Sequence, residues 1–465
     1  MSGTGEIELS RLSAIGLRRL YEARSVSPVE VVGTLLAQIS QKNPRLNALV
    51  TIDSEGALAA ARKSEAKFSK SEPVGVLEGI PFTLKDVYAT AGLRTTWGSI
   101  FFKDQIPKKT AAIARKLKAA GAILLGKSNC PEFAYALYTD NALFGPTLNP
   151  WDETRVPGGS SGGDAVAVAA FMAPLGIGSD LGGSIRVPAH CCGLFGYIAS
   201  PGRVSNEGHC PVGTPISGAL VRPGFLTRSS EDIVLALRAC EGFNYLDPFS
   251  EPLSVPVAAD LEPASALRCM VLDFSDQLKI SAEVNAAVEN AGKILTANGG
   301  RLRSGKFPLA GELLRTQRTL MGTSLKASVE AMLSQTYPDD SLTIISHIDI
   351  PPSAEATSNL IVAYGMQAAI RTLVNSLFMQ ADILVIPVLG ETAFELKDRE
   401  GHRVTAARQL EMTQVNFLAI LAGLPAVAVP FGKGADGLPI AVQLIAQRDQ
   451  DELLLRAARM LEATI

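Results

Sequence analysis

Histidine and cysteine are scarce in this chain of 465 residues, which holds four histidines and six cysteines. So few cysteines cannot cross-link a chain of this length, which excludes a fold held together by disulfide bonds. A reducing compartment, the cytoplasm, is therefore expected. Neither an HExxH motif nor a pair of CxxC motifs occurs, and Cys191 and Cys192 are adjacent. The sequence therefore predicts no structural or catalytic metal.

An excess of charge of one sign is also lacking. The 43 basic and 46 acidic residues give a net charge of −3, and the basic residues form no cluster. We therefore expect no nucleic-acid partner. Residues 1–10 lack the basic start and apolar run of a signal peptide. No uncharged run reaches the roughly 20 residues that a membrane helix needs, so no membrane association is expected.

What the chain does contain is apolar residues, at 47%, against 19% charged residues. This composition predicts a large buried core, and the low charged share leaves a homodimer open. Short apolar strands alternate with segments of helical spacing, which indicates an α/β layered fold. Strands are predicted at 80–84, 122–125, 175–178, 381–388 and 426–430. Helices are predicted at 12–23, 29–40, 55–69, 110–120, 164–171, 229–240, 285–297, 311–333, 409–421 and 451–463.

Two glycine-rich clusters that carry serine lie close together, PGGSSGG at 157–163 and GSDLGGSIR at 178–186. Glycine-rich runs add little to a hydrophobic core and destabilise a helix. They do let backbone N–H groups approach a ligand and stabilise developing charge. A lone lysine, Lys85, precedes them in GIPFTLKD at 79–86. Two serines and a lysine in this setting predict acyl-transfer chemistry that needs no histidine.

These motifs resemble those of the amidase signature family. Further similar segments follow in the family's order: GKSNCPEFA at 126–134, LNPWD at 148–152, AGLPA at 422–426 and GLPIAVQLI at 437–445. The resemblance implies one amidase domain over residues 1–465, with a large mixed β-sheet covered by helices on both faces. It also implies a signature core at about 75–230 and a variable region at about 241–378, which we expect to shape the substrate entrance.

The resemblance also implies a Ser-cisSer-Lys triad. Ser184 would be the nucleophile that forms the acyl-enzyme, Ser160 the proton relay and Lys85 the terminal base. A lysine near its ordinary pKa of about 10.4 would be protonated, so Lys85 must be buried to act as a base. The implied oxyanion hole consists of the backbone N–H groups of Leu181, Gly182, Gly183 and Ser184. The implied supporting residues are Gly159, which shares the cis peptide with Ser160, and Ser161, Asp180 and Arg186, with Arg186 pairing with Asp180.

Two other patterns in the chain compete with this interpretation. Residues 158–162 match the GxSxG pattern of α/β-hydrolases, which would make Ser160 the nucleophile and require His347 or His402 as its partner. Residues 121–128 match the P-loop pattern, but 122–125 are apolar and favour a strand over a phosphate cradle. His190 is interpreted as a packed side chain.

We expect an amidase, a hydrolase of linear C–N bonds, that converts small carboxamides to carboxylate and ammonia or amine without a cofactor. The alternative is the glutamine-hydrolysing subunit of a tRNA-dependent amidotransferase. Val187 and the segment 198–201 depart from the residues that such subunits carry, which favours the stand-alone enzyme. A third hypothesis, a non-catalytic protein with this fold, conflicts with the intact Lys85, Ser160 and Ser184.

Overall fold

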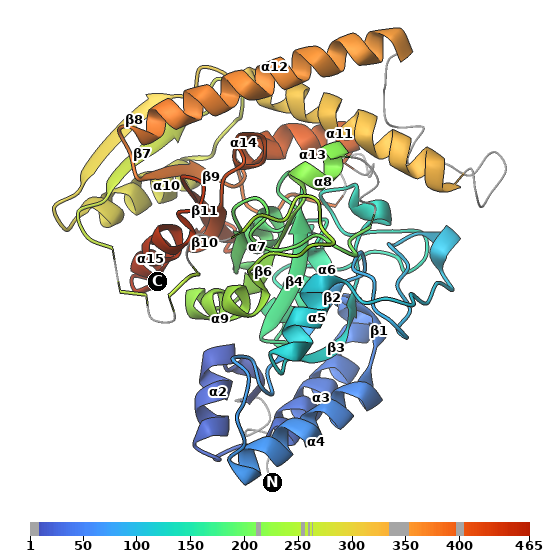
Figure 1. Ribbon diagram of the computed structural model, residues 1–465. Coiled ribbons are helices and arrows are strands. Elements are labelled where there is room, and N and C mark those ends of the chain that lie inside the picture. Colours follow the sequence, from blue (N-terminus) through green and yellow to red (C-terminus); the bar gives the residue numbers. More distant parts are fainter. Residues whose placement is uncertain are drawn as a thin grey trace.

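A single mixed sheet runs through the computed structural model of this protein (Figure 1). The structure describes residues 9–210, 215–252, 256–258, 261–262, 264–333, 353–396 and 404–465. Eleven strands of the described chain are β1 Leu49–Ile52, β2 Pro81–Lys85, β3 Ile123–Ser128, β4 Leu175–Asp180, β5 Phe195–Ile198, β6 Arg222–Thr227, β7 Arg268–Asp273, β8 Arg301–Lys306, β9 Ile383–Pro387, β10 Ala426–Lys433 and β11 Pro439–Ala446.

The strand order in the sheet is β1-β3-β2-β4-β6-β5-β10-β11-β9-β7-β8. Strands β3, β2 and β4 run parallel to one another, as do β9, β7 and β8. Antiparallel pairs connect these two groups through β6, β5, β10 and β11. The predicted α/β fold with a large mixed sheet is confirmed.

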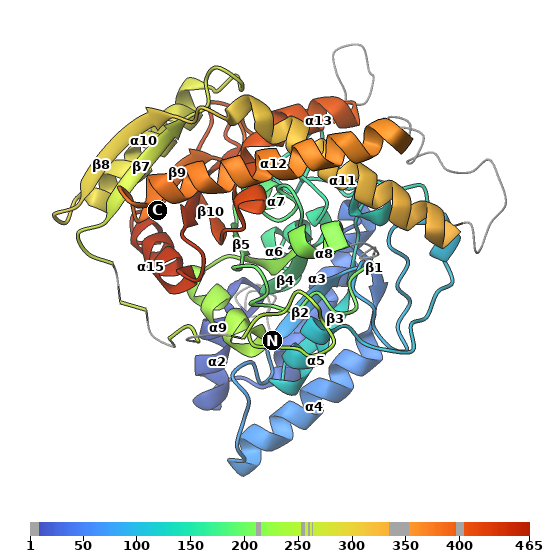
Figure 2. The ribbon, with the colours of Figure 1, turned by 45° about the horizontal axis from the view of Figure 1, so that its top comes forward.

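Helices cover the sheet and extend beyond it at both ends. They are α2 Ala14–Glu22, α3 Pro28–Leu46, α4 Ser54–Lys70, α5 Ala112–Ala119, α6 Gly162–Ala169, α7 Arg186–Cys192, α8 Pro215–Leu220, α9 Ser230–Cys240, α10 Ala282–Thr296, α11 Ala310–Leu333, α12 Ser353–Phe378, α13 Ala406–Thr413, α14 Phe417–Ala422 and α15 Asp451–Glu462. In Figure 1, α2, α3 and α4 gather at one end of the molecule. The long helices α11 and α12 pack together across the opposite end (Figure 2).

Local sequence signals set several helix boundaries. Helix α3 starts at a reciprocal cap, in which Glu30 N–H donates to Ser27 Oγ at 3.1 Å and Ser27 N–H donates to Glu30 Oε2 at 2.8 Å. Pro28 suits the first helical turn, where its missing N–H costs nothing. The predicted single helix at 409–421 is instead two helices, α13 and α14, separated by a 3₁₀ turn at Gln414–Asn416.

No helix within the described ranges is both long enough and apolar enough to cross a bilayer.

Candidate active site

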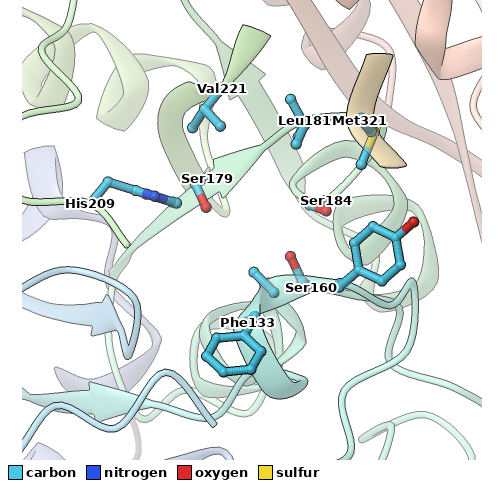
Figure 3. A pocket seen from close by; sticks show the side chains of 10 residues that line it. Phe133, Ser160, Ser179, Leu181, Ser184, His209, Val221 and Met321 are labelled. Carbon is cyan, nitrogen blue, oxygen red and sulfur yellow. The ribbon is translucent and has the colours of Figure 1, made fainter. Parts of the chain in front are cut away.

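Two parallel neighbouring strands end together at the site. β2 ends at Lys85 and β4 ends at Asp180, so both carboxyl ends meet at one edge of the sheet. The loops before α6 and α7 bring Ser160 and Ser184 to this edge. Figure 3 shows Ser160, Ser179 and Ser184 turned into the same pocket, which we call the serine pocket.

The amine of Lys85 is held inside the protein by three oxygen atoms. Its Nζ lies 2.7 Å from Ser160 Oγ, 3.2 Å from Ser179 Oγ and 3.3 Å from the Ser179 carbonyl. The side chain is fully buried, and burial lowers the pKa of Lys85 to about 8, although Cys130, Asp164 and Asp180 oppose the shift. About a tenth of the amine is therefore neutral at pH 7 and about half at pH 8, so Lys85 can act as a proton acceptor near neutral pH.

Gly159 is required by the packing around Ser160. A Cβ atom at this position would lie 2.7 Å from the backbone nitrogen of Tyr138 and 2.8 Å from the carbonyl carbon of Leu137. Backbone atoms cannot move aside as a flexible side chain can, so any larger residue would displace the loop. The Gly159–Ser160 peptide bond is cis.

Ser161 ties the first glycine cluster to β4 and to the second cluster. Its Oγ donates to the Ser179 carbonyl at 3.2 Å and accepts from Ser179 N–H at 3.3 Å. Its own N–H donates to the Ser184 carbonyl at 3.0 Å. These bonds fix the backbone of both serine-bearing loops relative to each other.

Asp180 and Arg186 form a buried ion pair beneath the second cluster. Arg186 Nη2 lies 2.8 Å from Asp180 Oδ1, and both side chains are fully buried. Arg186 also donates from Nη1 to the Asn416 carbonyl at 2.8 Å and to Gln443 Oε1 at 2.6 Å. Burial alone would raise the pKa of Asp180, but Arg186 and two backbone N–H groups hold it at about 2. The pairing expected from the sequence is therefore present in the structure.

The same carboxylate organises the backbone where the oxyanion hole is expected. Asp180 Oδ1 accepts from Gly182 N–H at 3.0 Å and from Gly183 N–H at 2.7 Å. Among the described residues, the N–H groups of Leu181 and Ser184 have no partner. Of the four donors expected from the sequence, Gly182 and Gly183 thus bind Asp180 in this conformation, whereas Leu181 and Ser184 remain available to a ligand. Gly183 has a φ of +117°, which a side chain would strain.

We expect Asp180→Asn to lower the free energy of unfolding by about 3 kcal/mol, because it leaves the buried Arg186 without its counter-charge. The carboxylate has a pKa of about 2, below the ordinary 3.8. Its stabilisation is therefore present above pH 4 and is lost as the pH falls toward 2. Urea unfolding at pH 7 measures the effect. The control is Glu22→Gln, which breaks the half-exposed Arg18–Glu22 pair and should cost less than about 1 kcal/mol. Equal losses in the two variants would contradict the prediction.

The walls of the serine pocket are mostly apolar. Apart from the three serines and the hydroxyl of Tyr135, its polar side chains are His209 and Gln409. The apolar lining consists of Phe133, Ala134, Tyr135, Ala136, Leu137, Leu181, Val221, Met321, Leu410 and Phe417.

His209 is a site residue that sequence reasoning missed. Its ring lies edge-on to Tyr88, with centroids 5.0 Å apart, and neither ring nitrogen has a partner within the described structure. Burial, assisted by the positive charge of Lys85, lowers the pKa of His209 to about 3, so the ring is neutral at pH 7. Figure 3 shows the imidazole directed toward Ser179 across the serine pocket. A neutral imidazole offers one donor and one acceptor to a bound substrate.

Two further polar residues support the site and were not singled out from the sequence. Asp164, behind Lys85, accepts from Thr83 Oγ1 at 2.7 Å and from Ser128 Oγ at 2.6 Å. Burial raises the pKa of Asp164 to about 6, against the effect of these two bonds. Gln317 of α11 donates from Nε2 to the Leu181 carbonyl, which links the variable region to the second glycine cluster.

The described structure argues against the P-loop pattern and against a catalytic role for His190. Lys127 of the P-loop match lies in the buried strand β3, 3.5 Å from Asp86 Oδ1, and Thr95 Oγ1 accepts from its amine at 3.1 Å. His190 is buried and bonded on both nitrogens to backbone groups of Glu391 and Ala441, and burial lowers its pKa to about 4. His347 and His402 lie outside the described residues. Within the described ranges, no three His, Cys, Asp or Glu side chains converge as metal ligands would.

Comparison with known proteins identifies the family. Residues 30–455 match the family model for Amidase. The chain belongs to the amidase signature family. A curated relative from Acidothermus cellulolyticus, named as a glutamyl-tRNA(Gln) amidotransferase subunit, is 33% identical over 98% of this chain and 95% of its own length.

Two solved structures are also similar to this chain. One, described with a vestigial protein complex and the origins of an s-triazine catabolic enzyme, has a TM-score of 0.86 and 30% identity, covering 97% of this chain and 98% of that one. The other, a bacterial aryl acylamidase of the amidase signature family, has a TM-score of 0.84 and 25% identity, covering 97% and 96%.

The comparisons correct the prediction about partners. The curated relatives are named as subunits of an amidotransferase for glutamyl-tRNA(Gln). The exclusion of a nucleic-acid partner is therefore wrong. It rested on the net charge of −3 and on the absence of a basic cluster, which describe this chain alone. One protein of a complex can work with a nucleic acid whose charge is matched elsewhere in that complex.

Proposed function

We propose that this protein hydrolyses the C–N bond of a carboxamide through an acyl-enzyme on Ser184. The observation that carries the proposal is the 2.7 Å contact between Lys85 Nζ and Ser160 Oγ beside the pocket into which Ser184 opens. Membership of the amidase signature family supports it. The unpaired thiols of all six cysteines support the cytoplasm as the site of action.

In the proposed reaction, Ser184 Oγ attacks the amide carbon while its proton passes through Ser160 to Lys85. The tetrahedral oxyanion accepts hydrogen bonds from Leu181 and Ser184 N–H. Collapse of this intermediate breaks the C–N bond, and the proton on Lys85 returns through Ser160 to the departing amine. Water then attacks the acyl-enzyme by the same proton route, which releases the carboxylate and restores Ser184.

Glutamine, hydrolysed within a tRNA-dependent amidotransferase, is the candidate substrate that the curated relatives favour. They carry the name of a component of that enzyme, and the alignment with the relative from Acidothermus cellulolyticus covers nearly the whole of both chains. On this proposal the ammonia released at Ser184 is passed to a second active site on a partner chain. The sequence departures at Val187 and 198–201 lie outside the Lys85–Ser160 contact and leave this chemistry intact.

An apolar carboxamide is the second candidate, and the lining of the serine pocket favours it. Glutamine carries a charged amine and a charged carboxylate, which require partners when they leave water. Among the described lining residues none is charged, whereas ten are apolar or aromatic. Met321 of α11 lies among them, which supports a role for the region at about 241–378 in shaping the substrate entrance of the single domain.

Release of ammonia from a panel of amides tests the proposal and separates the two candidates. The panel contains glutamine, asparagine, hexanamide and benzamide, each with wild-type protein and with Ser184→Ala as the background. We expect release from at least one amide. Glutamine turnover, alone or raised by added amidotransferase partner proteins, supports the first candidate. Turnover of hexanamide or benzamide but not of glutamine supports the second. No release from any amide, with or without partner proteins, would contradict the proposed hydrolysis.

A further inference from the structure

A second cavity, of about 530 Å³, lies on the other side of the chain segment that enters β6. It shares no lining residue with the serine pocket among the described residues. The two cavities are separated at Val221 and Arg222, since Val221 lines the serine pocket and Arg222 lines the second cavity. The side chains of successive residues in an extended chain point to opposite sides. Val221 and Arg222 therefore face different cavities.

Arg222 is a buried cation with unused hydrogen-bonding capacity. Its side chain is 4% exposed, and its Nη1 donates to the carbonyls of Ala219 at 2.7 Å and Val221 at 3.2 Å. Its Nε has no partner, and no described carboxylate lies within ion-pair distance of the guanidinium. A buried charge without a counter-charge is costly, so the side chain is poised to bind an anion.

Two more arginines line the same cavity. Arg371 donates from Nε to the Leu421 carbonyl at 3.0 Å and, in the described structure, has no carboxylate partner. Arg448 pairs with Glu251. Burial, assisted by the positive charges of Arg448 and Arg371, lowers the pKa of Arg222 to about 9, although Asp180 and Glu251 oppose the shift. The three guanidinium groups therefore lie close enough to repel one another.

The two carboxylates of the cavity offset part of this positive charge, but neither forms an ion pair with Arg222 or Arg371 within the described structure. Glu251 forms an ion pair with Arg448. Asp247 accepts from Ser205 Oγ at 2.9 Å, Asn206 N–H at 2.7 Å and Phe249 N–H at 3.0 Å, which ties it to the surrounding loops. Arg222 and Arg371 are thus the two cations that remain without a carboxylate partner among the described lining residues.

We propose that this cavity binds a small anionic metabolite whose carboxylate or phosphate group is held between Arg222 and Arg371. Guanidinium groups present paired N–H donors that match both kinds of oxyanion. The volume lies in the range of small-molecule sites. This site is distinct from the amide-hydrolysing pocket, and it takes a ligand that is not cleaved.

Calorimetric titration of the full-length protein with inorganic phosphate and with succinate, in dilute chloride buffer, tests the proposal. We expect saturable one-to-one binding of at least one of the two probes. Arg222→Met and Arg371→Met should each weaken it by about tenfold or more, since each removes a charge-assisted hydrogen bond. Arg62→Met removes the same charge from the exposed surface of α4 and should leave the affinity unchanged.

Binding of phosphate alone identifies a phosphate ligand, and binding of succinate alone a carboxylate ligand; either supports the site. Absence of saturable binding of both probes overturns it, as does an affinity in Arg371→Met equal to that of Arg62→Met. Circular dichroism accompanies each variant. If Arg222→Met does not fold, the exposed Arg371 decides the outcome through Arg371→Met and Arg371→Lys, the latter retaining charge and part of the affinity.

Discussion

Ser184→Ala is expected to lower kcat for amide hydrolysis by a factor of about 10⁴ or more. The variant lacks the oxygen that would carry the acyl group, and no other serine can replace it. Ser160 Oγ lies 2.7 Å from the Lys85 amine, where it can pass on a proton. Ser179 is bound to the same lysine at 3.2 Å. The expected loss is therefore close to total.

A serine-directed fluorophosphonate provides the measurement that separates nucleophile from relay. Mass spectrometry should place the adduct on the peptide with Ser184 in the wild type, and Ser184→Ala should not be labelled. Ser160→Ala should retain part of its activity, because a water molecule can occupy the space of the lost hydroxyl and transfer the proton. An adduct on Ser160 instead would assign the nucleophile to the GxSxG pattern and contradict the proposed mechanism.

The positions of Lys85, Ser160 and Ser184 were accessible from the sequence because short motifs surround each of them. Glycine density shows where the backbone must come close to a ligand, and a hydroxyl or amine beside it shows the chemistry. The distances were not accessible, since the Lys85–Ser160 contact joins residues 75 positions apart. The Arg186–Gln443 bond joins residues 257 positions apart, so only the sheet order brings them together.

Residues without a motif around them were missed. His209 and Gln317 lie in segments with no glycine cluster, and each reaches the site through a turn or helix whose direction the sequence does not specify. The strand β8 was missed because its residues, Arg301–Lys306, are all exposed and show no apolar alternation. The break at Gln414–Asn416 was missed because buried residues continue on both sides of it, with Met412 and Thr413 before it and Phe417 and Leu418 after it, as in one helix.

Activity is expected to rise with pH along a limb whose midpoint lies near 8, because that is the pKa to which burial lowers Lys85. Below this pH the amine is protonated and can donate to Ser160 but cannot accept its proton. Above it the neutral amine draws the proton from Ser184 through Ser160. The pH dependence of kcat/KM in the free enzyme measures this pKa directly.

Lys85→Ala is expected to lower kcat by about 10³ or more and to remove this limb, since a general base in a triad acts together with its nucleophile. The fold should persist. The pKa of Lys85 in the folded protein, about 8, lies below the ordinary 10.5, so at pH 7 the amine binds its proton more weakly in the folded than in the unfolded chain. Removing it relieves that cost, which offsets the lost hydrogen bonds.

The Lys85→Arg variant tests the positive charge at this position separately from the ability to accept a proton. The guanidinium stays protonated at every accessible pH, so this variant should be as inactive as Lys85→Ala while keeping a cation at the site. Lys63→Ala, on the exposed face of α4, should keep wild-type turnover and the same pH limb. Circular dichroism spectra of all variants establish that the fold is retained. A limb near pH 8 that survives in Lys85→Ala, or wild-type turnover in that variant, would mean that another group accepts the proton of Ser184.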